Sequence, residues 1–367
     1  MLEAIEPAWA LTAAGLLIGG LFGAVAQRSH FCTMGAVSDL VLFGSRRRLR
    51  AWTLAIITAL VGTQTLALAG LVPVGTSAHL APRLFWLGAI SGGLVFGFGM
   101  VLAGGCVSRA LVRLGGGSLK ALVVLLVTGI SAFLIASGPL AGITGALVAI
   151  GSVPLPLPTG GLDAVLAGPL GLSPTVATLA ATGLVLVPLA AFIADRRFLA
   201  GRADLATGVA LGALVALGWL ATATLVDPSG PAASAASLTF VAPTGGSIVW
   251  LMVGAGEVPG FGVATILGTV LGAALACVAS GGVRLETFAS RDDMLRHLTG
   301  GVLMGVGGAL AGGCSIGQGV TGVSALSLQA LMALAAILLG GVWGVKYLET
   351  GRLLPRLGRG AAAASAG

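Results

Sequence analysis

Charged residues are scarce in this sequence. Only 8% of its 367 residues are Asp, Glu, Lys or Arg, whereas a soluble domain carries about 25%. Hydrophobic residues make up 57% of the chain, and they recur in apolar runs of about 20 residues, long enough to cross a hydrocarbon core of about 30 Å. The shortage of charge excludes a fold that must cover itself with polar surface in water. It predicts an all-α polytopic membrane protein.

Several kinds of site also lack their signature residues. The basic residues, which give a net charge of +7, lie in short segments between the apolar runs and form no patch with aromatic residues, so we expect no nucleic-acid partner. No two of the four cysteines have CxxC spacing, and the three histidines are scattered. We therefore predict no disulfide framework, no metal site and no cofactor. No Asp, Glu or Lys lies deep in an apolar run, so the carboxylate relay of many ion-coupled carriers is not visible.

Nine membrane spans are expected from the apolar runs, together with two shorter re-entrant segments. The spans fall at residues 8–26, 51–72, 84–103, 118–137, 174–194, 204–226, 259–280, 297–311 and 327–348. Residues 30–43 and 238–253 are apolar, but they are too short or too rich in proline and glycine to cross, so we interpret them as re-entrant half-helices. Residues 139–169 are interpreted as an outer connection, and residues 350–367 as a disordered cytosolic tail.

The basic residues set the expected orientation. With the N-terminus outside, 18 of the 19 Lys and Arg residues fall on the cytosolic side and only Arg83 falls outside, as the positive-inside rule requires. The first ten residues hold two acids and no base, which is the wrong charge for a cleaved signal peptide, so we expect the first span to be retained. This pattern predicts a multi-pass protein of a bacterial inner membrane with its C-terminus in the cytosol.

The strongest feature of the sequence is an internal repeat. Residues 92–106 are GGLVFGFGMVLAGGC and residues 300–314 are GGVLMGVGGALAGGC, with nine of fifteen positions identical at an offset of 208 residues. Four spans in the first repeat and one central span put the second repeat in the opposite orientation. Inverted repeats of this kind are typical of transporters with a binding site near the membrane midplane. We predict a first repeat at 1–137, a connection and central span at 138–200, and a second repeat at 201–349.

The LAGGC motif places a thiol directly after a flexible glycine pair in both copies. The residues concerned are Gly104, Gly105 and Cys106, and Gly312, Gly313 and Cys314. Glycine allows a broken helix whose backbone N–H groups point into a cavity, and new helix N-termini after each break add partial positive charge, which suits an anion. A thiol is a weak donor with a polarizable sulfur, which suits a sulfur-containing ligand. The alternative is that both cysteines are small buried core residues.

The remaining candidate residues each have a structural alternative. Cys32, in SHFCTMG, either lines the path or packs in the core. Gln318, in GGCSIGQG, either meets the substrate or makes a helix–helix hydrogen bond. Arg28 is either a cytosolic anchor or a charge at the inner mouth, and Thr244 either lines the outer mouth or belongs to a turn. Cys277 lies in the plain apolar run GAALACVAS and is expected to be a packing residue.

The segments SHFCTMG, LAGGCVSR and GGCSIGQG resemble the motifs of the YeeE/YedE family of sulfur-compound transporters, and the resemblance covers nearly the whole chain. The resemblance implies an hourglass-like inverted-repeat fold and thiosulfate uptake through a constricted path. It also implies that one cysteine from each motif lines that path, which here gives Cys32, Cys106 and Cys314. A small TusA-like cytosolic sulfurtransferase that receives the imported sulfur is the implied partner.

Two other functions stay open beside a non-enzymatic carrier of thiosulfate or a related sulfur anion. A passive channel for another small sulfur compound or a neutral molecule would differ in how uptake depends on substrate charge and membrane potential. A membrane thiol oxidoreductase would need paired cysteines poised for exchange, and the spacing of the cysteines offers no such pair.

Overall fold

The computed structural model describes residues 2–226, 234–254 and 256–352, and in these ranges the chain is almost entirely helical. The strands of the described part are β1 (Arg83–Leu84) and β2 (Val153–Pro154), which pair antiparallel. Eight of the described helical stretches are long and apolar enough to cross a membrane. They lie at Ala8–Phe43, Arg47–Leu68, Gly88–Gly115, Leu119–Ala136, Pro174–Ile193, Arg202–Leu225, Phe261–Ala279 and Leu328–Thr350. The predicted all-α polytopic membrane fold is confirmed.

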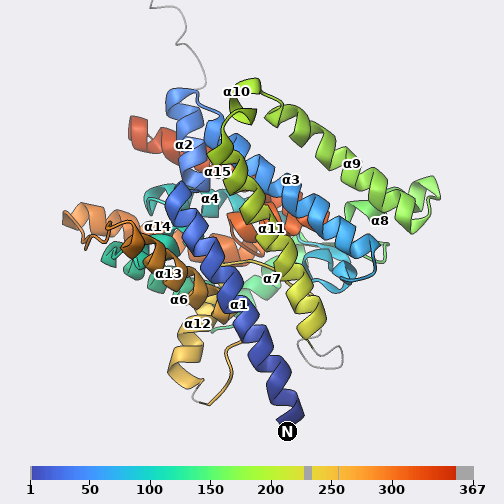
Figure 1. Cartoon of the computed structure of the whole chain (residues 1–367), viewed down its shortest axis with the longest axis horizontal. Helices are drawn as coiled ribbons and strands as arrows, with labels where there is room; N and C mark the ends of the chain where they lie inside the picture. Colours follow the sequence, from blue (N-terminus) through green and yellow to red (C-terminus); the bar gives the residue numbers. More distant parts are fainter. Residues whose placement is uncertain (1, 227–233, 255, 353–367) are drawn as a thin grey trace, which may run out of the picture.

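Figure 1 shows the order of the helices along the chain. Their bounds are α1 Leu2–Ser29, α2 Thr33–Phe43, α3 Arg47–Leu68, α4 Gly93–Leu102, α5 Val107–Gly115, α6 Leu119–Ala136, α7 Ala141–Gly151, α8 Leu162–Leu170, α9 Pro174–Ile193, α10 Arg196–Leu199, α11 Arg202–Leu225, α12 Val241–Val253, α13 Phe261–Ala279, α14 Arg291–Ala311 and α15 Leu328–Thr350. Single turns of 3-10 helix are η1 Val74–Thr76 and η2 Ala78–Leu80, and π-helical segments are η3 Gly88–Gly92 and η4 Gly317–Gly322.

The expected span at 297–311 corresponds to α14, which is not among the eight apolar stretches. Its first turns hold charged residues, including Asp293 and Arg296, and the rest of the helix is rich in glycine, which lowers its hydropathy. The helix is nevertheless central, because it packs against both α4 and α6. Helix α14 therefore has the length of a span but a lower hydropathy than the eight apolar stretches, and its crossing of the membrane stays a prediction.

Glycine lets the two long helices α1 and α13 come into close contact. A Cβ on Gly19 or Gly23 of α1 would clash with backbone atoms of Thr265 or Thr269, and one on Gly272 of α13 would clash with the carbonyl oxygen of Gly20. Small residues at such positions are the usual means of packing membrane helices, since backbones can then approach closely. The α1–α13 pair forms one wall around the central helices.

The helices that carry the two LAGGC copies, α4 and α14, are antiparallel. Near one end of the pair, a Cβ on Gly92 would lie 2.6 Å from the amide nitrogen of Ala311. Near the other end, a Cβ on Gly300 would lie 2.5 Å from the amide nitrogen of Ala103. The two motif copies therefore run in opposite directions, and the glycine pairs that follow α4 and α14 lie at opposite ends of this helix pair.

The packing partners of the two halves correspond to each other. Helix α1 packs on α13 and α3 packs on α11, while α4 packs on α15 and α6 packs on α14. Each of these contacts joins an early helix to a late one, so the halves interlock around a shared core. The boundaries of the repeats at 1–137, 138–200 and 201–349, and the re-entrant nature of α2 and α12, stay predictions.

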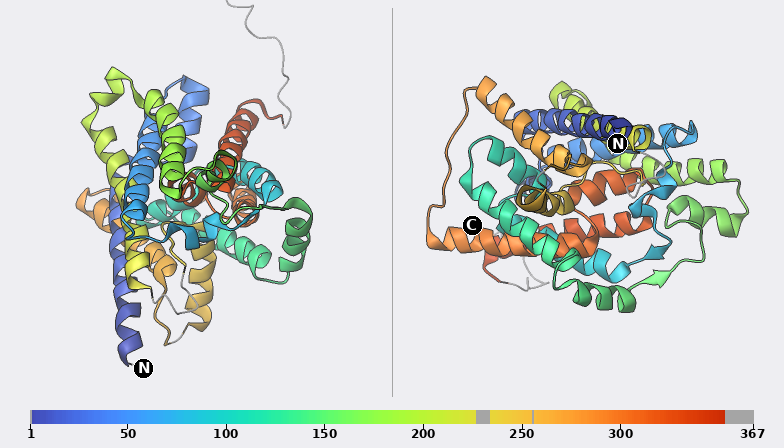
Figure 2. Two further views of the ribbon diagram at one scale, coloured as in Figure 1. Left: turned by 90° about the vertical axis from the view of Figure 1, so that its right-hand side faces the viewer. Right: turned by 90° about the horizontal axis from the view of Figure 1, so that it is seen from below.

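The helices that connect the two halves, the start of α1 and the end of α15 lie at the periphery of the bundle. Helices α8, α9 and α10 project from one side of the bundle in Figure 1, where α9 packs on α3 and α8. Figure 2 shows the start of α1 and the end of α15 at opposite ends of the bundle. Which end faces the cytosol stays a prediction, and the expected disordered tail at 350–367 lies mostly outside the described residues.

Candidate functional site

Both glycine pairs break their helices in the same way. Gly104 and Gly312 adopt φ values of 71° and 76°, and Gly105 and Gly313 adopt 156° and 157°. The amide of Gly105 donates to Met100 O, and that of Gly313 to Gly308 O, both at 2.8 Å. These φ values belong to a region that residues with a Cβ rarely occupy. The sequence therefore needs glycine here to end each helix and turn the chain toward the following cysteine.

The segments after the two breaks return toward each other and bring three thiols together. Cys106 and Cys314 are each 1% exposed, and Cys32 is partly buried. The Cys106 thiol lies within hydrogen-bonding range of the Cys32 thiol and the Ser315 hydroxyl, and Cys314 lies near it. The three cysteines from the three predicted motifs therefore form one buried cluster.

The hydrogen bonds of the thiols are similar in two of the three motifs. The Cys32 sulfur accepts from the Gly35 amide at 3.4 Å, and the Cys314 sulfur accepts from the Gly317 amide at 3.3 Å. Cys32 is the N-cap of α2 in this way, so the thiol sits at the positive end of a helix. Cys106 instead contacts the Ser108 hydroxyl at 3.2 Å and is the N-cap residue of α5.

A pair of buried hydroxyls joins two of the motifs, although the sequence analysis did not select either residue. Thr33 Oγ1 donates to Ser315 Oγ at 3.0 Å across 282 positions of sequence. Each of these residues directly follows a cysteine of the cluster, Cys32 or Cys314. The hydroxyl residue directly after Cys32 and after Cys314 was the signal available in the sequence.

A polar cavity of about 300 Å³ adjoins the second glycine break, and Gln318 lines it. Gln318 is 3% exposed, and its Nε2 donates to Ala311 O at 2.9 Å while its Oε1 has no hydrogen-bond partner. His79 lines the same cavity, and burial lowers its pKa to about 4. Both groups are therefore uncharged at neutral pH. The other lining residues with polar side chains are Ser77, Ser234, Ser237, Thr239, Ser327 and Gln329.

The first glycine break faces basic groups instead. A Cβ on Gly104 would lie 3.5 Å from both Arg113 Nη1 and His297 Nε2, and one on Gly105 would lie 3.1 Å from Arg109 Cγ. Arg109 Nη1 is buried without a hydrogen-bond partner, and its Nη2 lies 3.4 Å from His30 Nδ1. The two ends of the thiol cluster therefore differ in charge, because one end is neutral and polar and the other is cationic.

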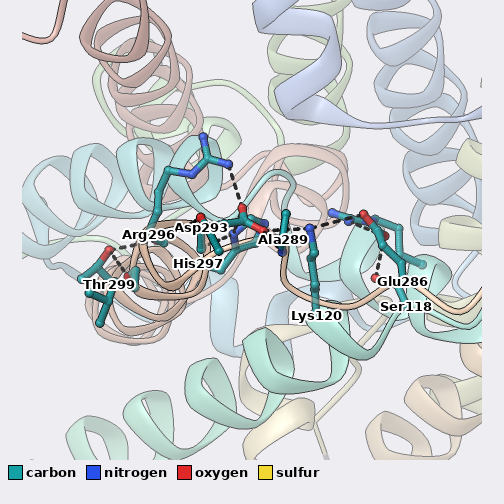
Figure 3. A network of polar contacts seen from close by, with 11 residues as sticks. Ser118, Lys120, Glu286, Ala289, Asp293, Arg296, His297 and Thr299 are labelled. Carbon is teal, nitrogen blue, oxygen red and sulfur yellow. Dashed lines mark hydrogen bonds and ion pairs between the residues drawn. The ribbon is translucent and has the colours of Figure 1, made fainter.

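A network of ion pairs holds the α13–α14 connection against the cationic end. Lys120 lies between Asp293 and Glu286, at 2.8 Å and 3.8 Å (Figure 3). Arg113 Nη2 also donates to Glu286, at 2.9 Å. The hydrogen bond from Arg113, together with one from the Ser118 hydroxyl, lowers the pKa of the Glu286 carboxyl. The carboxylates of this network are therefore ionised at neutral pH and neutralise the cations they contact.

Three other predicted residues lie outside the thiol cluster. Arg28 is exposed in the last turn of α1 and lines an apolar groove between α1 and α13. Thr244 is buried against Gly129 of α6, and its hydroxyl donates to Phe240 O at 2.6 Å. Cys277 is buried within α13 and is free, as the prediction of a packing residue requires. Within the described ranges, no group of three potential metal ligands gathers.

Known proteins are similar to this chain over almost its whole length. The model of a family described as Sulphur transport matches residues 28–343. The chain is 29% identical over 351 residues to the thiosulfate transporter TsuA of Escherichia coli, covering 91% of this chain and 93% of that protein. It is 30% identical over 347 residues to the thiosulfate transporter TsuA of Spirochaeta thermophila, covering 91% and 98%.

A shorter match covers 27% of the chain. Over 100 residues it is 32% identical to the probable transporter YedE of Salmonella typhimurium, of which it covers 23%. The long matches and the family model agree with the resemblance that the three cysteine motifs carry. The chain therefore belongs to the Sulphur transport family, the family of YeeE and YedE.

Proposed function

We propose that this protein takes up thiosulfate, or a related small sulfur anion, through the cluster of Cys32, Cys106 and Cys314. The observation that carries the proposal is the position of the cluster: three thiols from distant motifs meet between two glycine-broken helices. A polar cavity adjoins one end and a cationic group adjoins the other. The relatives named as thiosulfate transporters over almost their whole length support this substrate.

The path begins in the cavity lined by Gln318 and His79, which offers neutral polar groups to an arriving anion. The anion then meets the S–H groups of the cluster in turn. A thiol is a weak donor, and its polarizable sulfur suits the terminal sulfur of thiosulfate. Each contact is weak enough to release, as conduction requires. The hydroxyls of Thr33 and Ser315 hold the two cysteine segments together beside this path.

Uptake of a dianion needs a driving force. An inside-negative potential of about 100 mV opposes it by about 4.6 kcal/mol. With the N-terminus outside, as the distribution of basic residues predicts, the Gln318 cavity is the outer mouth and Arg109 is on the cytosolic side. Removal of the imported sulfur by a TusA-like sulfurtransferase at the inner mouth supplies the drive. The protein itself acts as a carrier in the inner membrane and not as an enzyme.

The test compares four cysteine variants in uptake of labelled thiosulfate by proteoliposomes, normalised to reconstituted protein. Cys106→Ala and Cys314→Ala are expected to lose most uptake, and Cys32→Ala is expected to lose as much or somewhat less. Cys277→Ala is the matched control, because alanine fits a packed helix with only a small loss of volume. A triple variant at 32, 106 and 314 that still transports would rule out the thiol path.

The same assay separates the alternative functions. Sulfate and sulfite serve as competitors, and the membrane potential is clamped at two values. A carrier of a sulfur anion responds to the potential and prefers thiosulfate, whereas a passive channel for a neutral molecule does not respond to the potential. A thiol oxidoreductase would change the redox state of the cysteines during the assay, which alkylation of free thiols detects.

A further inference from the structure

Arg109 has no counter-ion in the described part of the chain. Two other cations, Arg113 and Arg48, lie near enough to repel it electrostatically. Each of these two pairs with a carboxylate, Arg113 with Glu286 at 2.9 Å and Arg48 with Asp39 at 3.3 Å. None of the ion pairs formed by the described residues includes Arg109. A guanidinium that is half-buried in a membrane protein without an anion is costly, so its presence calls for a ligand or a function.

Arg109 also lies beside the thiols. It is the third residue of α5, whose N-cap is Cys106, and its guanidinium is close enough to interact electrostatically with Cys32 and Cys106. The Nη1 atom is fully buried and makes no hydrogen bond, while Nη2 lies 3.4 Å from His30 Nδ1. The Nη2 atom of the guanidinium therefore contacts His30, and the buried Nη1 atom remains available as a donor.

The second half of the chain places Gln318 where the first half places Arg109. Arg109 is three residues after Cys106, and Gln318 is four residues after Cys314, so the offset between matching residues of the two halves increases from 208 at the cysteines to 209 here. A Cβ on Gly105 would lie 3.1 Å from the Cγ of Arg109, and a Cβ on Gly313 would lie 3.3 Å from the Cγ of Gln318. Both side chains thus cross the second glycine of a break, and both end in a buried atom without a partner.

The difference between these two equivalent residues determines what each end of the path can bind. A neutral amide can meet anions and neutral molecules alike, whereas a guanidinium favours an anion and offers charge-assisted hydrogen bonds to its oxygens. The glycine at 105 allows the arginine stem to pass close to the backbone, so that the charge lies next to Cys32 and Cys106 and not out in the solvent.

We propose that Arg109 binds the sulfur anion as it leaves the thiol cluster and is the residue that makes the path selective for anions. The inference rests on the proposed transport function and assigns to it a residue that the cysteine mechanism does not use. The ligand class is a small oxyanion of sulfur, whose oxygens accept from Nη1 while its terminal sulfur remains near Cys32 and Cys106.

The experiment replaces Arg109 by Gln, which copies the residue of the opposite end, and by Lys, which keeps the charge but not the fork of donors. Arg28→Gln is the matched control, since it removes one basic charge from an exposed position that lines a different groove. Initial rates of labelled thiosulfate uptake into proteoliposomes are measured over a range of concentrations. Unfolding temperatures of the purified variants in detergent are measured with and without thiosulfate.

The proposal expects Arg109→Gln to lower uptake at low thiosulfate by about tenfold or more, the loss that follows from one charge-assisted hydrogen bond. The stabilising effect of thiosulfate on the unfolding temperature should disappear with it, while the ligand-free unfolding temperature stays the same. Arg109→Lys should raise the concentration for half-maximal uptake several-fold, and Arg28→Gln should match the wild type.

Wild-type uptake and ligand stabilisation in Arg109→Gln would overturn the assignment while leaving the transport function standing. If Arg109→Gln does not fold, Arg109→Lys decides, because an unchanged half-maximal concentration in that variant would also overturn the assignment. Wild-type protein that takes up no thiosulfate would overturn the transport function itself, and the role of Arg109 would fall with it.

Discussion

Substitution of the second glycine in each break tests whether the broken helices form the constriction. Gly105→Val and Gly313→Val place a β-branched side chain at φ values of 156° and 157°. The added Cβ would lie 3.1 Å from Arg109 Cγ in the first case and 3.3 Å from Gln318 Cγ in the second. Both neighbours are flexible side chains, so the clash displaces them and does not displace the backbone.

The expected energetic cost leaves the protein folded. A residue forced into this backbone region costs about 1–3 kcal/mol, and moving the neighbouring side chain adds about 1–3 kcal/mol. Folded proteins of this size have about 5–15 kcal/mol of stability, so each variant should insert and purify as a single species with a lower unfolding temperature. Thiosulfate uptake, however, should be lost, because the new side chain lies beside the buried thiols.

Gly183→Val in α9 is the control, since a Cβ there has open space and an ordinary helical backbone. Uptake by proteoliposomes and unfolding temperature in detergent are measured for all three variants. Normal uptake in both Gly105→Val and Gly313→Val would mean that the path does not pass the glycine breaks. Loss of uptake in Gly183→Val as well would mean that the assay reports membrane insertion and not the constriction.

Three further predictions concern the orientation in the membrane, the ion pairs of Glu286 and the α1–α13 contact. Reporter fusions at Ser290 and Ser234 should report cytosolic and outer locations, and the same location for both would contradict the predicted orientation. Glu286→Gln should lower the unfolding temperature at pH 7. The sign follows from the lowered pKa of Glu286, whose contribution is present above its unfolded value of about 4.3 and is lost as pH falls through the folded value. The variant should therefore lose the share of the wild type's acid dependence below about pH 4.3 that Glu286 supplies, while the share of Asp293, whose pKa is also lowered, remains. Gly272→Ala should destabilise the α1–α13 contact, whereas Gly20→Ala, whose Cβ would have its nearest neighbour at 3.7 Å, should be tolerated; equal unfolding temperatures would refute this packing.

Much of the site could be predicted because its parts are local. The glycine pairs had to be glycine to end a helix in this way, and the two copies of LAGGC adopt nearly the same φ values because they have nearly the same sequence. The assignment of Cys277 to packing followed from its plain apolar surroundings. The long helices followed from apolar runs, and α14 alone among the expected spans is not one of the eight apolar stretches, because it is a glycine-rich helix with a charged first turn.

Other parts could not be predicted because they depend on contacts between distant segments. Nothing near Thr33 in the sequence indicates that its hydroxyl meets Ser315, 282 residues away. Arg28 and Arg109 both follow apolar runs and look alike in the sequence, but one is exposed on a groove and the other lies beside the thiols. Thr244 is a buried packing residue, whereas Thr239, five residues earlier, lines the cavity.

The charge difference between the two ends of the thiol cluster comes from the chain segments that pack around it. Ser118 and Ser327 each precede a helix, and the next amide in each case donates to a crossing segment: Leu119 N to Glu286 O, and Leu328 N to Gly160 O. The segment that crosses at Ser118 brings a carboxylate, which pairs with Arg113 and Lys120.

No such carboxylate is needed at the other end, because Gln329 occupies the position of Lys120 there and Gln318 that of Arg109. One half of the repeat therefore carries cations together with their counter-ions, and the other half carries amides. In the cationic half, Arg113 and Lys120 are neutralised by Glu286 and Asp293. Among the described residues, the guanidinium of Arg109, next to the thiols, is left without a carboxylate partner, which is the basis of its proposed role in binding the anion.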